Sequence, residues 1–156
     1  MVKLYRSLKI NACIALVFGL APVVFSQDKA TLDTYRSKYP TEQVILLKDS
    51  KVVQIQNVKG ELRVVEHIHE EYLILDQNGG QYLSEEAIGH SSFEELKINE
   101  AYVMVPSESG TKKVQVTNIS TRDAKTDPGI FHDDNKETTL LFPRLEPGAL
   151  RVLDYT

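Results

Sequence analysis

The sequence predicts an all-β protein, an antiparallel β-sandwich with a short N-terminal helix that follows a signal peptide. Seven short segments alternate apolar and polar residues with a period of two, and turn residues separate them. Only residues 28–39 have the period of a helix, with Leu32, Tyr35 and Tyr39 on one face and Pro40 as the stop. The 156 residues suit one domain around one core.

The clearest expected strand is 61–76, which follows a Lys59–Gly60 turn and ends at an Asn78–Gly80 turn. Its predicted core-facing residues are Leu62, Val64, Ile68, Tyr72 and Ile74. Its other face carries Arg63, His67, His69 and Glu71. The remaining expected strands are 43–49, 51–57, 98–106, 112–119, 137–142 and 149–155, of which the last two form a hairpin around 143–148. Residues 81–95 read as irregular, and 121–136 as a polar loop.

Residues 1–26 have the pattern of a secretory signal peptide. Lys3, Arg6 and Lys9 form a basic start, 12–25 are nearly all apolar, and Ser26 is a small residue at the expected cleavage point. An uncleaved anchor is the alternative, but a bilayer span needs about 20 apolar residues, and this run is shorter. We therefore expect residues 27–156 to form the exported domain.

The single cysteine, Cys13, opens the apolar run and so lies within the predicted signal peptide. A lipid-anchored cysteine would follow the apolar run, so no lipid anchor is expected. After cleavage the chain can form no disulfide, thiolate metal site or cysteine nucleophile. Export without disulfides favours a bacterial periplasm or cell envelope over a eukaryotic secretory route.

The charge balance excludes some partners. Cleavage removes three positive charges and no negative ones, so the formal net charge of −4 becomes −7. Nucleic acids require a basic face, and an anionic membrane surface also attracts basic segments. We expect neither as a partner of the exported domain, for which the negative charge serves solubility.

Two groups of polar residues could bind metal ions. His67 and His69 share one face of a strand and could hold a transition metal with a third ligand, although this is also what a solvated face looks like. The loop 123–135 could take calcium through oxygen ligands, but its spacing is not that of a known calcium loop. Its oxygen-bearing residues are Asp123, Asp127, Asp133, Asp134 and Asn135. In both cases the favoured interpretation is solvated surface, with no metal or cofactor.

No catalytic residue is expected. No serine stands in a Gly-x-Ser-x-Gly turn, and His90 beside Ser91–Ser92 is proximity in sequence, which does not make a triad. The acidic pairs Glu85–Glu86 and Glu94–Glu95 would point to opposite faces of a strand.

Four segments in order resemble the domain of unknown function 3857, which precedes transglutaminase-like domains in exported bacterial proteins. They are KYPTEQVILLKDSKVVQI, GELRVVEHIHEEYLILDQNGG, ELKINEAYVMVPSESGTKKVQV and TTLLFPRLEPGALRVLDYT. The resemblance implies a β-sandwich accessory domain without catalytic residues. It also implies that 27–156 correspond to the N-terminal part of the family domain and are incomplete.

We therefore expect a non-catalytic exported accessory or interaction domain that is not an enzyme. Its partner would be a protein or an adjacent domain that docks by a strand or sheet edge, and self-association is a further outcome. The alternation in ALRVLDYT puts apolar residues on both faces, as in a strand that expects neighbours. The alternatives are a small-ligand or calcium-binding module that uses 123–135, and an enzyme with an unrecognised site.

Overall fold

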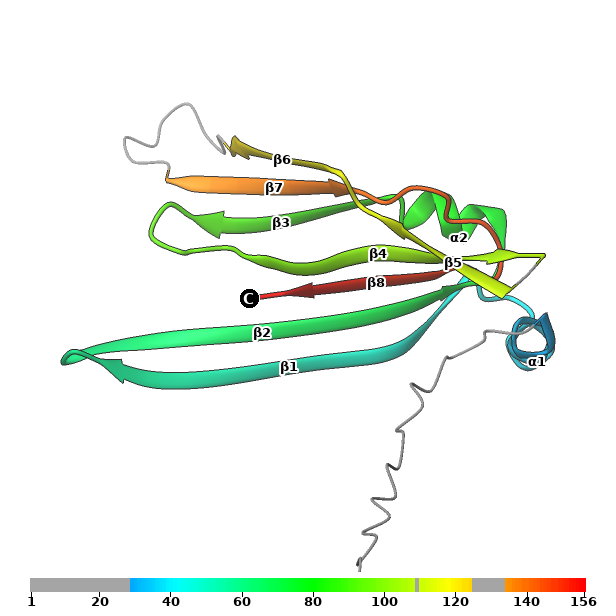
Figure 1. Ribbon diagram of the computed structural model, residues 1–156, viewed down its shortest axis with the longest axis horizontal. Helices are drawn as coiled ribbons and strands as arrows, with labels where there is room; N and C mark the ends of the chain where they lie inside the picture. Colours follow the sequence, from blue (N-terminus) through cyan, green and yellow to red (C-terminus); the bar gives the residue numbers. More distant parts are fainter. Residues whose placement is uncertain (1–28, 109, 125–133) are drawn as a thin grey trace, which may run out of the picture.

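A computed structural model describes residues 29–108, 110–124 and 134–156. The described chain is mostly antiparallel β-structure in two sheets, which confirms the all-β prediction (Figure 1). The larger sheet has the order β1 (Val44–Val58), β2 (Glu61–Ile74), β8 (Leu150–Tyr155), β4 (Ile98–Ser107) and β5 (Gly110–Gln115). The smaller has the order β3 (Glu85–Ser91), β7 (Asn135–Leu141) and β6 (Asn118–Asp123). The predicted signal peptide lies outside the described residues.

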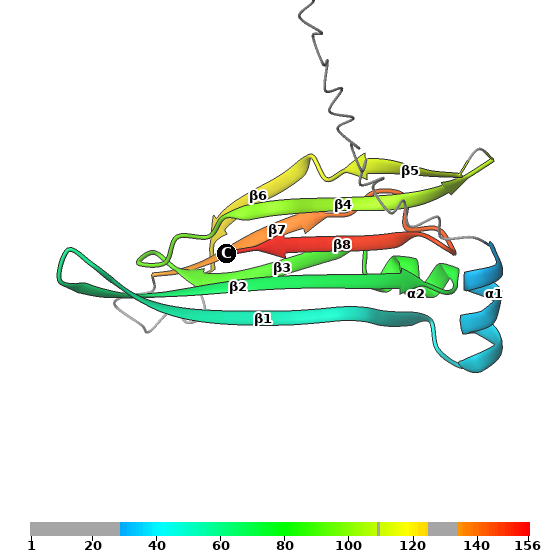
Figure 2. The ribbon, with the colours of Figure 1, turned by 60° about the horizontal axis from the view of Figure 1, so that its bottom comes forward.

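The two sheets share one apolar core. Figure 2 shows the two sheets from a second direction. Strands β2, β4 and β8 of the larger sheet and β3 and β7 of the smaller sheet each bury at least one apolar side chain in it. Fully buried members include Ile74, Val103, Leu140 and Leu153. The alternating residues that face each other between the sheets therefore hold the two layers together.

Strands β1 and β2 form a long hairpin that extends past the end of β8 (Figure 1). The Lys59–Gly60 turn is confirmed: both residues have positive φ, 56° and 91°, and Asn57 Oδ1 accepts a hydrogen bond of 2.9 Å from the Gly60 N–H. The expected break at 49–50 is wrong. Asp49 and Ser50 pair with β2 within one continuous strand, because the long partner strand outweighs their weak strand preference.

The short N-terminal helix is confirmed as α1 (Lys29–Lys38), which lies at one end of the larger sheet (Figure 2). Arg36 fixes it there by donating a hydrogen bond of 2.8 Å from Nε to the carbonyl oxygen of Leu75. None of the helices in the described residues is long and apolar enough to cross a membrane.

The expected turn at 78–80 is instead a second helix, α2 (Gln77–Tyr82). Asp76 caps it, because its side chain accepts a hydrogen bond of 2.8 Å from the Gly79 N–H. Gly79 and Gly80 are buried, and a Cβ on either would collide with the carbonyl oxygen of Gln43 or Leu145. These glycines serve close packing here. The expectation that 81–95 are irregular is wrong for 85–91, which form the regular strand β3.

Two expectations for the C-terminal half are also wrong. The expected strand 112–119 is two strands, because β5 ends at Gln115 in the larger sheet and β6 begins at Asn118 in the smaller one. Buried Val116 lies at this crossing, and β6 runs on to Asp123 within the expected loop. The expected hairpin of 137–142 with 149–155 does not form. Strand β7 pairs with β3 and β6, whereas β8 lies between β2 and β4.

Candidate functional site

The candidate site begins where β8 ends. Its pairing with β2 runs from Leu73 opposite Leu150 to Ile68 opposite Tyr155. Thr156 then exchanges backbone hydrogen bonds of 2.8 and 2.9 Å with Lys97. Among the described residues, 61–67 of β2 pair with β1 alone, so their other side is a free edge of the sheet. We refer to residues 61–67 as the free edge.

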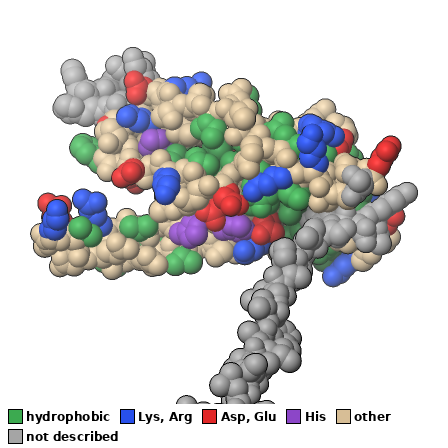
Figure 3. Space-filling model, viewed as in Figure 1, with side chains coloured by type: hydrophobic (Ala, Val, Ile, Leu, Met, Phe, Trp, Pro, Cys, Tyr) green, Lys and Arg blue, Asp and Glu red, His purple; other side chains and the backbone are tan. Residues whose placement is uncertain are grey.

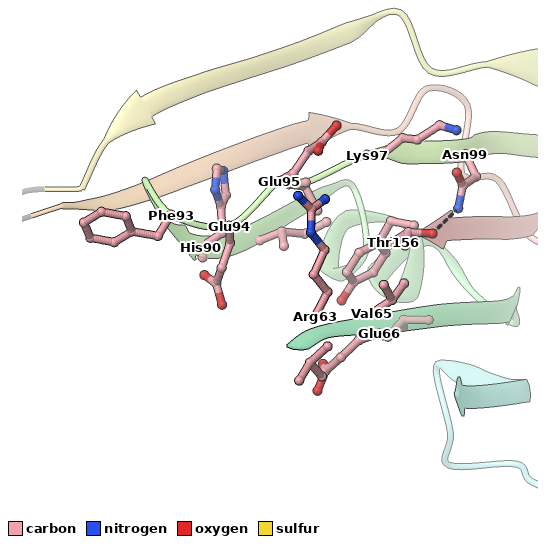
Figure 4. A pocket seen from close by; sticks show the side chains of 16 residues that line it. Arg63, Val65, Glu66, His90, Phe93, Glu94, Glu95, Lys97, Asn99 and Thr156 are labelled. Carbon is pink, nitrogen blue, oxygen red and sulfur yellow. Dashed lines mark hydrogen bonds between the residues drawn. The ribbon is translucent and has the colours of Figure 1, made fainter. Parts of the chain in front are cut away.

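A cleft of about 870 Å³ lies along the free edge (Figure 4). One wall is β2, and the facing wall is the connection between β3 and β4, residues 92–97. Tyr155 and Thr156 close one end of the cleft, and Ile88 and His90 of β3 line its interior side. In the space-filling view the hairpin stands apart from the rest of the molecule, with the hollow between them (Figure 3).

Large apolar side chains are exposed around the cleft. Leu62 is 76% exposed, Val64 is 63% exposed, and Phe93 on the facing connection is 90% exposed. The prediction that Leu62 and Val64 belong to the core is therefore wrong. They do share a face with Ile68 and with buried Ile74, but the hairpin carries them beyond the smaller sheet that covers this face. Such a grouping of exposed apolar residues is typical of an interaction surface.

Some charged side chains in the cleft have a hydrogen-bond or ion-pair partner, and others have none among the described residues. Glu66 forms an ion pair with Lys51 at 2.8 Å, and Glu94 accepts a hydrogen bond of 2.6 Å from the Ser91 N–H. Arg63 points from β2 into the cleft, and Lys97 lies on the facing wall (Figure 4). Within the described chain neither of these two cations has a carboxylate within ion-pair distance. Glu95 also lines the cleft and forms no ion pair with the described residues, so the cleft holds unpaired charge of both signs beside apolar surface.

His67 and His69 lie on the face of β2 opposite Ile68, as predicted, and both contact Asp154 of β8. His67 Nε2 is 2.7 Å from Oδ1, and His69 Nδ1 is 2.9 Å from Oδ2. His69 Nε2 also lies 2.8 Å from Glu71, and Asn99 donates to Asp154 at 2.9 Å. Figure 3 shows histidine and acidic side chains gathered on this face. This imidazole–carboxylate cluster fastens the end of β8 to β2.

The hydrogen bonds of the cluster shift two pKa values. Burial alone lowers the pKa of His69, but hydrogen bonds to Glu71 and Asp154 outweigh it and raise the pKa above the ordinary 6.5. Burial alone raises the pKa of Asp154, but hydrogen bonds from His67, His69 and Asn99 outweigh it and lower the pKa below 3.8. These two shifts favour the protonated form of His69 and the ionised form of Asp154 together.

The structure does not arrange the cluster as a metal site. Both carboxylate oxygens of Asp154 already contact imidazoles, and the described residues contain no group of three His, Cys, Asp or Glu that could hold a metal ion. Of the loop considered as an alternative calcium site, Asp123 ends β6, Asp134 precedes β7 and Asn135 begins it. Asp127 and Asp133 lie outside the described residues, so the structure does not test the calcium alternative.

His90 does not meet a serine hydroxyl. Its Nε2 lies 3.1 Å from Thr138 Oγ1 and its Nδ1 lies 3.2 Å from the Ser91 carbonyl oxygen. The Ser91 hydroxyl accepts instead from the Phe93 N–H at 3.3 Å. Through these contacts His90 stabilises β3 and the connection that follows it.

Sequence reasoning missed Arg151, which is only 1% exposed and lies between the sheets. Its Nη2 donates to Glu86 Oε2 at 2.6 Å, and its guanidinium lies 4.2 Å from the centre of the Phe142 ring. Glu70 lies nearby, and burial together with the negative charge of Glu86 raises the pKa of Glu70. The alternation of 149–155 shows which residues share a face with Arg151, but no local signal marks that face as interior.

The comparisons with known proteins place this fold in a family. The model of a domain of unknown function with a solved structure, DUF3857, matches residues 61–156, and the chain belongs to this family. A crystal structure from Parabacteroides distasonis ATCC 8503, described as that of a "putative protease", is similar over 72% of this chain, with a TM-score of 0.60 and 18% identity. This chain covers 22% of that one, and at this identity the likeness establishes the fold alone. No curated protein matches the sequence.

Proposed function

We propose that the protein is a non-catalytic accessory domain that docks against another protein or protein domain, of the kind that precedes a transglutaminase-like domain. The observation that carries the proposal is the free edge of β2, with Leu62, Val64 and Phe93 exposed beside it. Unpaired backbone groups next to exposed apolar side chains form a surface suited to association with another chain.

The structural relative supports an accessory role. The similar region makes up 22% of a chain described as a "putative protease", so this fold occurs there as one part of a larger protein. By analogy, we propose that the domain supports a hydrolase or acyl-transfer domain rather than performing that chemistry itself.

We also propose that the protein acts in the periplasm or cell envelope after cleavage behind Ser26. The support is the basic start, the apolar run and the small residue that ends it. N-terminal sequencing of protein from the envelope fraction should begin at Gln27. A mature protein that begins at Met1 would contradict export by cleavage.

The absence of catalysis is tested by turnover. The purified chain should release no peptide from an unfolded protein substrate and transfer no amine to a glutamine donor. Because His90 next to Ser91 is the strongest remaining candidate for chemistry, His90→Gln and Ser91→Ala serve as the diagnostic variants. Turnover that either substitution abolishes would overturn the proposal.

A further inference from the structure

We propose that His69 is a proton-sensitive link between β2 and β8. As an imidazolium it holds Asp154 and Tyr155 of β8 against β2, and as a neutral ring it lets these residues open locally. The link lies on the face of β2 opposite Ile68, and all of its side chains belong to strands of the larger sheet. It does not depend on the proposed docking function.

Each ring nitrogen of His69 meets a carboxylate oxygen. Nδ1 lies 2.9 Å from Asp154 Oδ2, and Nε2 lies 2.8 Å from Glu71 Oε1. An ionised carboxylate only accepts hydrogen bonds, and an imidazole ring donates from both nitrogens only when it is protonated. Both contacts are therefore hydrogen bonds at the same time only while His69 is an imidazolium.

Loss of the proton weakens both contacts. One nitrogen keeps its N–H, while the other turns a lone pair toward a carboxylate. The hydrogen bond that remains also loses its positive donor, and hydrogen bonds from a charged donor are roughly twice as strong as neutral ones. Whichever nitrogen of His69 keeps the hydrogen, its contact with Asp154 therefore becomes weaker.

The charges around His69 favour the imidazolium at neutral pH. Burial and the charge of Lys48 lower the pKa of His69, but hydrogen bonds to Glu71 and Asp154 outweigh them and raise the pKa above 6.5. Lys48 is itself engaged, because its Nζ lies 3.7 Å from Glu71 Oε1. The charged and titratable groups next to His69 on this face are Lys48 of β1, His67 and Glu71 of β2, Asp154 of β8 and Glu100 of β4, which lies opposite Asp154.

The opening is local because β8 is held unequally along its length. Arg151 is only 1% exposed between the two sheets, so the middle of the strand stays fixed. Tyr155 forms the last pair of the β2–β8 register, opposite Ile68, and Asp154 next to it carries the contacts to His69. Because Tyr155 also lines one end of the cleft, deprotonation of His69 would open the cleft at that end.

Amide hydrogen exchange of the purified chain tests the link. The Ile74 N–H donates to the Ala149 carbonyl, and the register has no shift, so the two-residue period points the Tyr155 N–H toward β2 as well. Exchange is corrected for its intrinsic pH dependence, and an NMR titration reports the charge of His69. The protection of the Tyr155 N–H should fall about three-fold or more as the pH rises through the pKa of His69, whereas that of the Arg151 N–H should stay constant.

Three variants identify the residue that senses the proton. His69→Gln should make the protection of Tyr155 independent of pH over the same range. His67→Gln is the matched control and should keep the pH dependence, because His67 contacts Asp154 through Nε2 and a neutral ring can still donate there. Glu71→Gln should lower both the pKa of His69 and the size of the pH effect, since a neutral His69 can then donate to Asp154 and accept from the amide.

Each contrary result overturns a definite part of the proposal. Protection of Tyr155 that does not follow the titration of His69 would overturn the proton-sensitive link. An equal loss at Arg151 would overturn local opening, because the whole strand would respond. A flat profile in His67→Gln would overturn the assignment to His69. None of these results concerns the absence of catalysis, which substrate turnover tests separately.

Discussion

Arg151 of β8 and Glu86 of β3 connect the two sheets through a contact of 2.6 Å between Nη2 and Oε2. The guanidinium is almost wholly buried, and its Nε and Nη1 atoms have no hydrogen-bond partner among the described residues. Among the described residues its only anionic hydrogen-bond partner is Glu86, whose side chain is one-third exposed. The stability of the sandwich should therefore depend on this carboxylate.

We expect Glu86→Ala to lower the free energy of unfolding by about 2 to 3 kcal/mol, because it leaves a buried cation without its partner. The double variant Arg151→Met with Glu86→Leu should regain much of this loss, since apolar residues of similar volume can replace a buried ion pair. Urea unfolding measures both. A double variant less stable than Glu86→Ala would contradict the account.

The imidazole–carboxylate cluster should make stability depend on pH. The raised pKa of His69 gives a contribution that is full below 6.5 and is lost as the pH rises through that raised pKa. The lowered pKa of Asp154 gives one that is full above 3.8 and is lost as the pH falls through that lowered pKa. The difference in Tm between the native chain and His69→Gln should therefore be largest between pH 3.8 and 6.5.

The control for this pH profile is Gln56→Ala, an exposed neutral change on the same hairpin. Its Tm difference from the native chain should stay constant across the same pH range. A His69→Gln difference that is equally flat would show that the contacts to Asp154 add no charge-dependent stability.

The close packing of α2 predicts opposite results for two glycines. Gly80→Ala should destabilise the protein strongly, because the added methyl group would overlap the carbonyl oxygen of Leu145. Gly89→Ala is the matched control in β3, where an added Cβ meets nothing within 4 Å. It should be neutral or slightly stabilising through the unfolded chain. Thermal unfolding compares them, and equal losses would contradict the packing of α2.

The position of the hairpin predicts that two leucines differ greatly. Leu153→Ala should cost about 2 to 5 kcal/mol, because Leu153 is fully buried between the sheets. Leu62→Ala should cost less than about 0.5 kcal/mol, because Leu62 is exposed. Guanidinium unfolding of both variants tests this. Comparable losses would mean that something covers the free edge in the isolated chain.

Local sequence patterns correctly predicted the strands whose side-chain alternation is regular and whose ends are marked by turn residues. The alternation of 61–74 and of 98–107, and the turn at Lys59–Gly60, follow from side-chain period and backbone preference. The alternation also placed His67 opposite Ile68. It could not place Leu62 outside the core, because a period tells which residues share a face and not how far the covering sheet extends.

The contacts and strand neighbours that the sequence did not predict depend on pairing between residues far apart in the chain. Asp154 is 87 residues from His67, and no local signal marks them as partners. The same holds for the neighbours of β8, since adjacent strands in sequence usually pair and β7 and β8 do not. In α2, the Asp76 cap and packing against Leu145 override the turn preference of Gly79 and Gly80.

The strand β8 follows the other described strands in sequence yet lies third in the five-stranded sheet, between β2 and β4. The β1–β2 and β4–β5 hairpins can each form early, because their strands are neighbours in sequence. They become one sheet only when β8 pairs with both β2 and β4. Closing the sheet then requires contacts between residues far apart in sequence, which slows folding. A ribosome must therefore release residues 44–155 before this sheet can close, so the strands that are made first stay available for other contacts until β8 has emerged.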